Sequence, residues 1–107
     1  MYYTYNITFV VLPHEEKELV RFLREELIPE VFNDNDNSHH VEIRKVIETG
    51  GERLDPNHGV SIALAGTFHS EEAARLWRDN KFLPAVSNFN LRFGNEAVYF
   101  MTLLENL

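Results

Sequence analysis

The stretch VSIALAGTF (residues 60–68) alternates between large apolar side chains and small ones. One side carries Val60, Ile62, Leu64 and Phe68, and the other carries Ser61, Ala63, Ala65 and Thr67. Alternation of this kind predicts a β-strand with one face in the core. The second side lacks the charged residues that are typical of a sheet face open to water. This strand therefore predicts a sheet that avoids water on both faces.

The segments on either side of this stretch predict a regular succession of strands and helices. Further strands are expected at residues 4–12, about 40–48 and 97–104 because apolar and β-branched residues gather there. A first helix opens at Pro13 and carries apolar residues at helical spacing. A second helix begins after the N-cap Ser70, breaks at residues 79–81 and ends at Gly94.

The order strand, helix, strand, strand, helix, strand predicts one α+β domain over residues 1–107. Two right-handed β-α-β units in this order interlock as a ferredoxin-like βαββαβ fold. Its four-stranded antiparallel sheet carries both helices on one face. The side chains expected to face the helices are Tyr5, Ile7, Phe9, Ile62, Leu64 and Phe68.

The opposite face of the predicted sheet suggests a homodimer. It is expected to carry Ala63, Ala65, Tyr99, Met101 and Leu103, with Asn6, Thr8 and Thr67 among them. A monomer rarely exposes an apolar patch larger than about 300–600 Å². Packing this face against a second copy across a two-fold axis is the simplest way to cover it. The alternative is a monomer whose own C-terminal tail covers the last strand.

Composition excludes several classes of partner and points to a location. A formal net charge of −7 argues against nucleic acid, because phosphates would be repelled. No apolar run approaches the roughly 20 residues of a membrane span, and no basic signal peptide precedes the first strand. The absence of cysteine removes thiol chemistry and is compatible with a reducing compartment. The cytoplasm is the predicted location.

Metal and cofactor motifs are weak in this sequence, and we predict neither a metal nor a cofactor. Its five histidines lack the H-x-x-x-H or H-x-H spacing that would bring ligands together. Residues 34–38 resemble the start of a calcium loop. However, His39 replaces the required Gly, and Lys45 stands where a bidentate Glu is needed. No glycine pattern fits a phosphate-binding loop.

Six residues are candidates for lining a ligand cavity. Five are expected on the inter-sheet side, namely Asn6, Thr8, Arg44, Thr67 and Tyr99, and the sixth is Trp77 on the second helix. A few polar groups among apolar walls are typical of small-molecule sites. Arg44 would orient an anion there. The alternative is that these polar groups satisfy one another or water across a dimer interface, and that Trp77 is a core residue.

Several short motifs resemble those of a small bacterial family of unassigned function. They are Tyr5-Asn6-Ile7-Thr8, Ile28-Pro29-Glu30-Val31, Arg92-Phe93-Gly94, Val98-Tyr99-Phe100 and Leu104-Glu105. The family is similar in fold to the dimeric α/β-barrel superfamily. The resemblance implies this fold and paired sheets, and it transfers no catalytic residue. The chain departs from shorter relatives in the loop at 33–38 and the turn at 49–59.

Two functions follow as hypotheses, and the residues leave open whether the protein is an enzyme. The first is a dimeric structural or small-molecule-binding domain, because no catalytic constellation is present. The second is a cofactor-independent monooxygenase or isomerase acting on a small aromatic or polyketide-like substrate. It rests on analogy of fold and would place substrate among Asn6, Arg44, Trp77 and Tyr99. A regulatory partner-binding subunit is a third option.

Overall fold

A computed structural model describes residues 1–33, 38–55 and 57–107 of the chain. The strands are β1 (Tyr3–Val11), β2 (Ser38–Lys45), β3 (Glu48–Thr49), β4 (Glu52–Arg53), β5 (Val60–Phe68) and β6 (Val98–Glu105). The helical segments are η1 (Pro13–Glu15), α1 (Glu16–Phe22), η2 (Leu23–Leu27), α2 (Ile28–Val31), α3 (Glu71–Trp77), η3 (Arg78–Phe82), α4 (Leu83–Ala85) and α5 (Phe89–Phe93). No helix in these described ranges combines the length and hydropathy of a membrane span.

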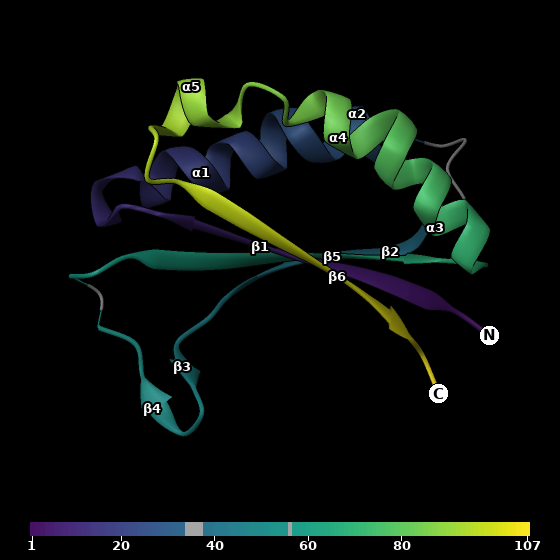
Figure 1. Ribbon diagram of the computed structural model, residues 1–107, viewed down its shortest axis with the longest axis horizontal. Coiled ribbons are helices and arrows are strands. Elements are labelled where there is room, and N and C mark those ends of the chain that lie inside the picture. Colours follow the sequence, from purple (N-terminus) through teal and green to yellow (C-terminus); the bar gives the residue numbers. More distant parts are fainter. Residues whose placement is uncertain (34–37, 56) are drawn as a thin grey trace.

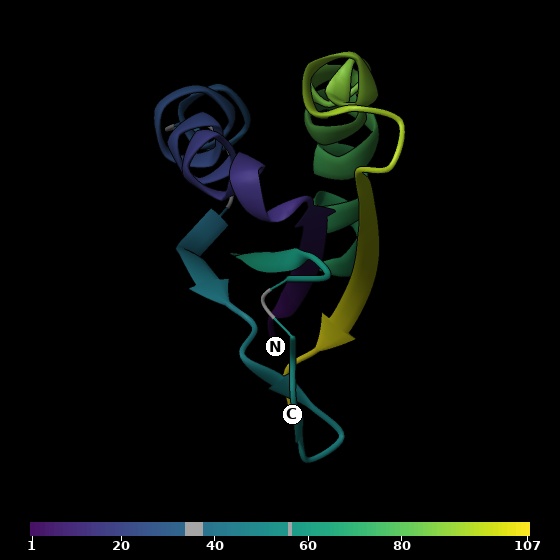
Figure 2. The same cartoon turned by 90° about the vertical axis from the view of Figure 1, so that its left-hand side faces the viewer.

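The main sheet has four antiparallel strands in the order β2-β5-β1-β6. All helices lie on one face of it, in two roughly parallel rows that are seen end-on in Figure 2. This architecture confirms the predicted ferredoxin-like α+β fold. The central pair is β1 with β5, and Ile7 lies opposite Leu64 on one side and Met101 on the other.

The core lies between the sheet and the helix layer. The strands bury Tyr5, Ile7, Phe9, Val11, Val60, Ile62, Leu64 and Phe68 there, as the alternation predicted. Aromatic side chains link the two layers, since the ring centroids of Phe9 and Phe89 lie 5.4 Å apart. Ser70 caps α3 by accepting a hydrogen bond from the Ala73 amide at 3.0 Å, and Gly94 ends α5 with a positive φ of 94°. The helix start at Ser70 and the helix end at Gly94 were therefore predicted correctly.

The break predicted at residues 79–81 is wrong, because the chain forms a π-helical turn (η3) there and the helix continues into α4. The helix ends instead at Val86, where φ is −104° and ψ is 12°. A π turn takes one extra residue, which shifts the apolar period without interrupting the helix. The first helix also contains a π-helical turn, η2. In both helices the segment that follows the π turn has proline as its second residue, Pro29 in α2 and Pro84 in α4. Proline has no N–H to donate within the helix, so a wider turn fits there.

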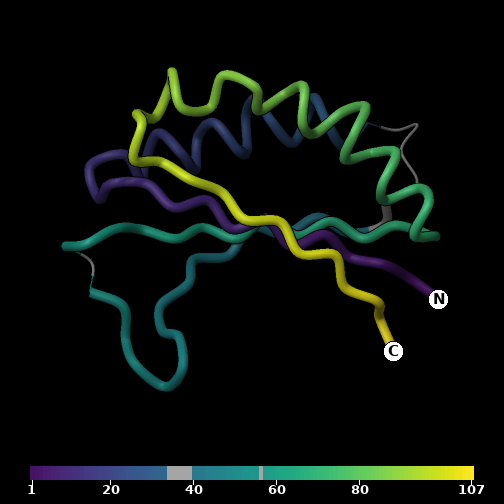
Figure 3. Tube along the Cα trace, viewed as in Figure 1, coloured from purple at the N-terminus to yellow at the C-terminus, as the bar shows by residue number. Residues whose placement is uncertain are grey.

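A short hairpin between β2 and β5 replaces the end of the second predicted strand. β2 ends at Lys45, and β3 and β4 pair with each other as a separate two-stranded sheet. Gly50 and Gly51 form its turn, with φ values of 63° and 82°. Two central residues with positive φ are typical of a type I′ hairpin turn, which glycine adopts without strain. We call residues 47–54 the arm, and the trace in Figure 3 shows it leaving the sheet on the side away from the helices.

Candidate binding surface on the sheet

The face of the sheet that points away from the helices is the candidate functional surface, and we call it the outer face. Its residues follow from the strand register and the alternating burial. They are Thr4, Asn6, Thr8 and Val10 from β1, Ser61, Ala63, Ala65 and Thr67 from β5, Val98, Phe100, Thr102 and Leu104 from β6, and His40, Glu42 and Arg44 from β2.

The prediction for β6 has the wrong face. Tyr99, Met101 and Leu103 point toward the helices and pack against the core. The Tyr99 ring lies 5.9 Å from that of Phe9 and 5.7 Å from that of Phe82, measured between centroids. Both sides of this strand are apolar, so alternation alone does not say which side is buried. Pairing with β1 decides it, because Tyr99 lies opposite Phe9.

After this correction the outer face still carries large apolar side chains on β6, together with Thr102. β6 presents Val98, Phe100 and Leu104 there, with 42%, 61% and 47% of their surface exposed. The neighbouring strands carry small side chains, because Ala63 and Ala65 of β5 lie opposite Thr8 and Asn6 of β1. The outer face therefore has a large apolar edge and a centre of small residues.

Polar groups at the centre of the outer face differ in whether they are paired. Thr4 shares a hydrogen bond with Thr67, with 3.0 Å between the hydroxyl oxygens, and a second with the Asn106 side chain at 3.1 Å. In the described part of the chain, neither Asn6 nor Thr8 has a side-chain hydrogen bond. These two side chains are half-buried and are available to a ligand or a second molecule.

Arg44 lies on the outer face as predicted, but its guanidinium already forms an ion pair within the chain. Its guanidinium pairs with Glu42, two residues away on the same strand. Glu42 also lies close to the His40 ring, with 2.8 Å between Nε2 and a carboxylate oxygen. Because an exposed ion pair is weak, an incoming anion would compete with Glu42 for this arginine.

Trp77 lies on the other side of the sheet from Asn6 and Arg44. It is 4% exposed and donates from Nε1 to the Val31 carbonyl at 2.6 Å. Its ring stacks on that of Phe32 at a centroid distance of 4.8 Å. The candidates therefore separate into an outer-face group and a core group of Trp77 and Tyr99. The substrate site predicted from Asn6, Arg44, Trp77 and Tyr99 does not assemble on one face.

Two hollows lie where the arm meets the sheet. One of about 270 Å³ has walls from the outer-face residues Val10 and Ser61 and from Leu54, Asp55 and His58. The second, of about 150 Å³, is lined by Lys45, Val46, Ile47, Arg53, Leu54, Gly59 and Val60. Both are smaller than the roughly 300–1,000 Å³ of typical small-molecule pockets.

His14, His40 and His58 each lie near a different carboxylate. His40 pairs with Glu42, His58 lies 3.5 Å from an Asp55 oxygen, and His14 lies 3.3 Å from a Glu15 oxygen. Within residues 1–33, 38–55 and 57–107, no group of three or more His, Asp or Glu could hold a metal ion. The loop that resembles a calcium site falls largely at residues 34–37, outside the described residues.

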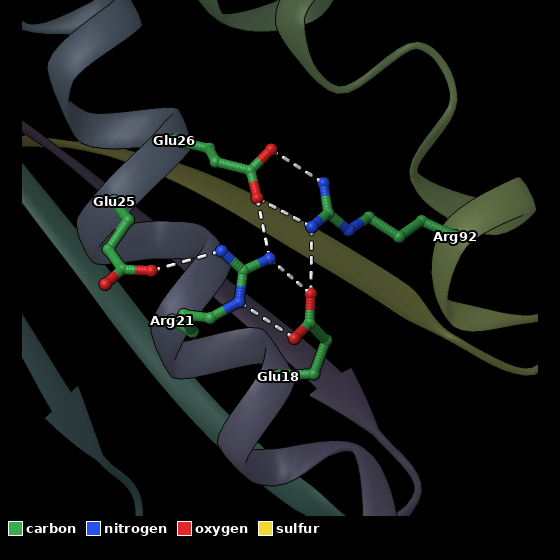
Figure 4. Close-up of polar contacts among 5 residues, drawn as sticks. All are labelled: Glu18, Arg21, Glu25, Glu26 and Arg92. Carbon is green, nitrogen blue, oxygen red and sulfur yellow. Dashed lines mark hydrogen bonds and ion pairs between the residues drawn. The ribbon is translucent and has the colours of Figure 1, made fainter.

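A charged cluster ties the helix layer together on the far side from the outer face (Figure 4). Arg92 of α5 donates to Glu18 of α1 at 2.8 Å and to Glu26 of η2 at 2.9 and 2.6 Å. Arg21 donates to the same two carboxylates and to Glu25. Hydrogen bonds from Arg21 and Arg92 lower the pKa of Glu18 to about 2, and those from Arg92 and Arg21 lower that of Glu26 to about 2.

The sequence matches the model of a family described as a domain of unknown function (DUF4286), and the match runs over residues 2–107. The chain belongs to the DUF4286 family. No significant match is found among curated proteins.

Solved structures similar to this DUF4286 chain share its fold at low identity. An ethyl tert-butyl ether D (EthD) family protein from Bacillus halodurans has a TM-score of 0.66 at 7% identity, covering 98% of this chain and 99% of that one. A DABB family protein with a ferredoxin-like fold from Mesorhizobium loti has a TM-score of 0.59 at 14% identity, covering 100% and 99%. SnoaB, a cofactor-independent oxygenase from Streptomyces nogalater, has a TM-score of 0.60 at 17% identity, covering 98% and 92%.

Sequence reasoning missed two parts of this surface, the apolar edge of β6 and the arm. The signal for the arm was present, because a glycine pair between short extended segments is typical of a type I′ hairpin. The residues Thr49-Gly50-Gly51-Glu52 fit that pattern. No comparable signal marked the outward side of β6.

Proposed function

We propose that this DUF4286 protein is a single-domain cytoplasmic homodimer in which two outer faces pack together around a small-molecule-binding cavity. The observation that carries the proposal is the exposed row of Val98, Phe100 and Leu104 on a strand at the edge of the sheet. Covering this row with a second copy removes apolar surface from water, at about 25 cal/mol per Å². A net charge of −7 disfavours nucleic acid as the partner instead.

The cavity follows from the sizes of the side chains on the outer face. The large apolar residues lie on β6, whereas the central strands carry Ala63, Ala65 and Thr8. When two such faces meet, the large side chains touch first and the small centres leave space between them. Asn6 and Thr8 would supply hydrogen-bonding groups inside an otherwise apolar enclosure, which is the usual design of a small-molecule site.

The oxygenase alternative receives no support from the geometry. The residues expected around its substrate lie on opposite sides of the sheet, with Trp77 and Tyr99 in the core. The likeness to SnoaB at 17% identity is one of fold and carries no activity to this chain. Binding without demonstrated catalysis is therefore the function that we propose.

Sedimentation equilibrium tests the interface. We expect a dimer at micromolar concentration, and we expect Phe100→Glu to give a folded monomer because it places a charge in the apolar contact. Leu91→Glu is the matched control, since Leu91 is 90% exposed on α5, in the helix layer. A monomeric wild-type protein, or a Phe100→Glu protein that stays dimeric, would contradict the proposal.

Dye binding tests the cavity separately. We expect the wild-type dimer to bind the fluorescent anion 1-anilinonaphthalene-8-sulfonate with saturable stoichiometry. Ala65→Leu, which fills the centre of the outer face, should reduce this binding at least tenfold without dissociating the dimer. A dimer with no saturable uptake of the dye would exclude the cavity and leave the interface in place.

A further inference from the structure

The arm forms a hairpin although little of it is buried. Seven of its eight residues are exposed, and only Leu54 is half-buried. Backbone hydrogen bonds of 2.9 Å hold its base, one from the Leu54 amide to the Ile47 carbonyl and one from the Val46 amide to the Ser61 carbonyl. An isolated two-stranded hairpin is at best marginally stable in water. A contact with another surface would stabilise the hairpin in this position.

The arm lies on the side of the sheet where the second copy is proposed to pack. Figures 1 and 2 show it extending away from the sheet opposite the helices. A second sheet stacks about 10 Å from the first. A hairpin that leaves the sheet on this side would therefore run alongside the second copy and not away from it.

The outer face alone provides fewer residues than a stable interface uses. Four residues from each of β1, β5 and β6 and three from β2 make fifteen, and several are Ala, Ser or Thr. Standard interfaces use roughly 20–30 residues on each side. The eight residues of the arm bring the total into this range.

A hollow joins the arm to the outer face. Its walls are Val10 and Ser61 of the sheet and Leu54 of the arm, with Asp55 and His58 beside them. It is an open depression of about 270 Å³, so a side chain of a neighbouring protein can reach it from the side of the outer face. Ile47 is an apolar residue on the arm itself, and 51% of its surface is exposed.

We infer that the arm is a clasp that packs against the second copy of the chain and completes the dimer interface. This inference rests on the proposed function, because the clasp acts only if the outer faces pair. By two-fold symmetry each copy clasps the other. The partner inserts a side chain into the hollow of about 270 Å³, and Ile47 lies against the partner's surface.

A shortened arm tests the clasp. Removing Glu48, Thr49, Glu52 and Arg53 leaves Gly50-Gly51 as a two-residue turn between Ile47 and Leu54, which already share a backbone hydrogen bond. A milder variant is Ile47→Glu, and its matched control is Leu76→Glu on α3, where 52% of the side chain is exposed. Far-ultraviolet circular dichroism and urea unfolding establish that each variant is folded.

We expect both arm variants to raise the dimer dissociation constant at least tenfold by analytical ultracentrifugation, and Leu76→Glu to leave it unchanged. Unchanged dissociation constants for folded arm variants would overturn the clasp and leave the outer-face dimer standing. A monomeric wild-type protein would remove both proposals. The two failures are therefore distinguishable.

A spin label gives a second readout that does not depend on affinity. Because the chain has no cysteine, Thr49→Cys accepts a nitroxide at one position on the arm. Its motion should slow as the protein concentration rises through the dimer dissociation constant, whereas a label at Glu72→Cys on α3 should not change. Equal motion of the Thr49→Cys label in monomer and dimer would overturn the clasp.

Discussion

At the scale of single residues, Gly66 shows how the sheet accommodates the aromatic cluster beneath the helices. A Cβ at this position would lie 2.5 Å from two ring carbons of Phe32. That ring is held in turn by stacking on Trp77 at 4.8 Å and on Phe68 at 6.2 Å between centroids. Phe32 therefore occupies the space that a side chain at residue 66 would need.

We predict that Gly66→Ala lowers the free energy of unfolding by about 1–3 kcal/mol, the usual cost of overpacking. Urea unfolding at neutral pH measures it. Adding Phe32→Leu to Gly66→Ala should recover part of the loss, because the smaller side chain frees the space. A Gly66→Ala protein as stable as the wild type would show that the Phe32 ring can move aside at little cost.

At the scale of elements, charged side chains connect α5 to α1 and η2 in addition to the packing of Phe22 on Phe93. Arg92 of α5 lies 4.7 Å above the Phe22 ring and donates to carboxylates on α1 and η2. Glu18 and Glu26 each meet two arginines, Arg21 and Arg92, and their pKa values fall to about 2. A carboxyl with a lowered pKa in the folded state stabilises that state only while it is ionised.

We predict that the free energy of unfolding decreases as the pH falls from about 4.5, the ordinary pKa of these carboxyls, to about 2. Arg92→Gln should flatten this dependence, because it removes one partner of both carboxylates. Urea unfolding at several pH values measures the slope.

Arg75→Gln is the control for this pH dependence, since Arg75 pairs at 3.0 Å with Glu71 within one helix. It should leave the slope nearly unchanged, as exposed pairs within a helix contribute little. If Arg92→Gln keeps the wild-type slope between pH 2 and 4.5, the cluster does not couple α5 to α1 in this pH range.

At the scale of the whole molecule, assembly is expected to contribute to stability. A chain of 107 residues buries a limited share of its surface by itself. Its outer face leaves Phe100 and Leu104 exposed, and its arm stands away from the core. Any partner that binds only the folded state stabilises it by mass action.

We predict that the midpoint of thermal unfolding rises by a few degrees when the protein concentration increases about a hundredfold, because dimer formation is coupled to folding. Differential scanning calorimetry measures this shift. In Phe100→Glu the midpoint should be lower and independent of concentration. A wild-type midpoint that does not change with concentration would argue against coupling between folding and assembly.

Much of the fold was predictable from local signals. The alternation in residues 60–68 identified β5 and its buried side, because the two sides of that strand differ in size and polarity. Ser70 and Gly94 marked a helix start and a helix end, since capping depends on a few neighbouring residues. Strand alternation also predicted the correct face of the sheet for four polar residues, Asn6, Thr8, Arg44 and Thr67.

The remainder required contacts between distant segments. β6 is apolar on both sides, so only its pairing with β1 determined that Tyr99 enters the core and Phe100 remains outside. The π turns shift the apolar period of both helices, so periodicity alone did not show that each helix continues. The direction of the arm depends on where β2 leaves the main sheet. By itself the sequence determined the four strands of the main sheet, the two helical regions and their order, through periodicity and capping. The tertiary structure decided which surface remains exposed, because strand register is a property of long-range pairing.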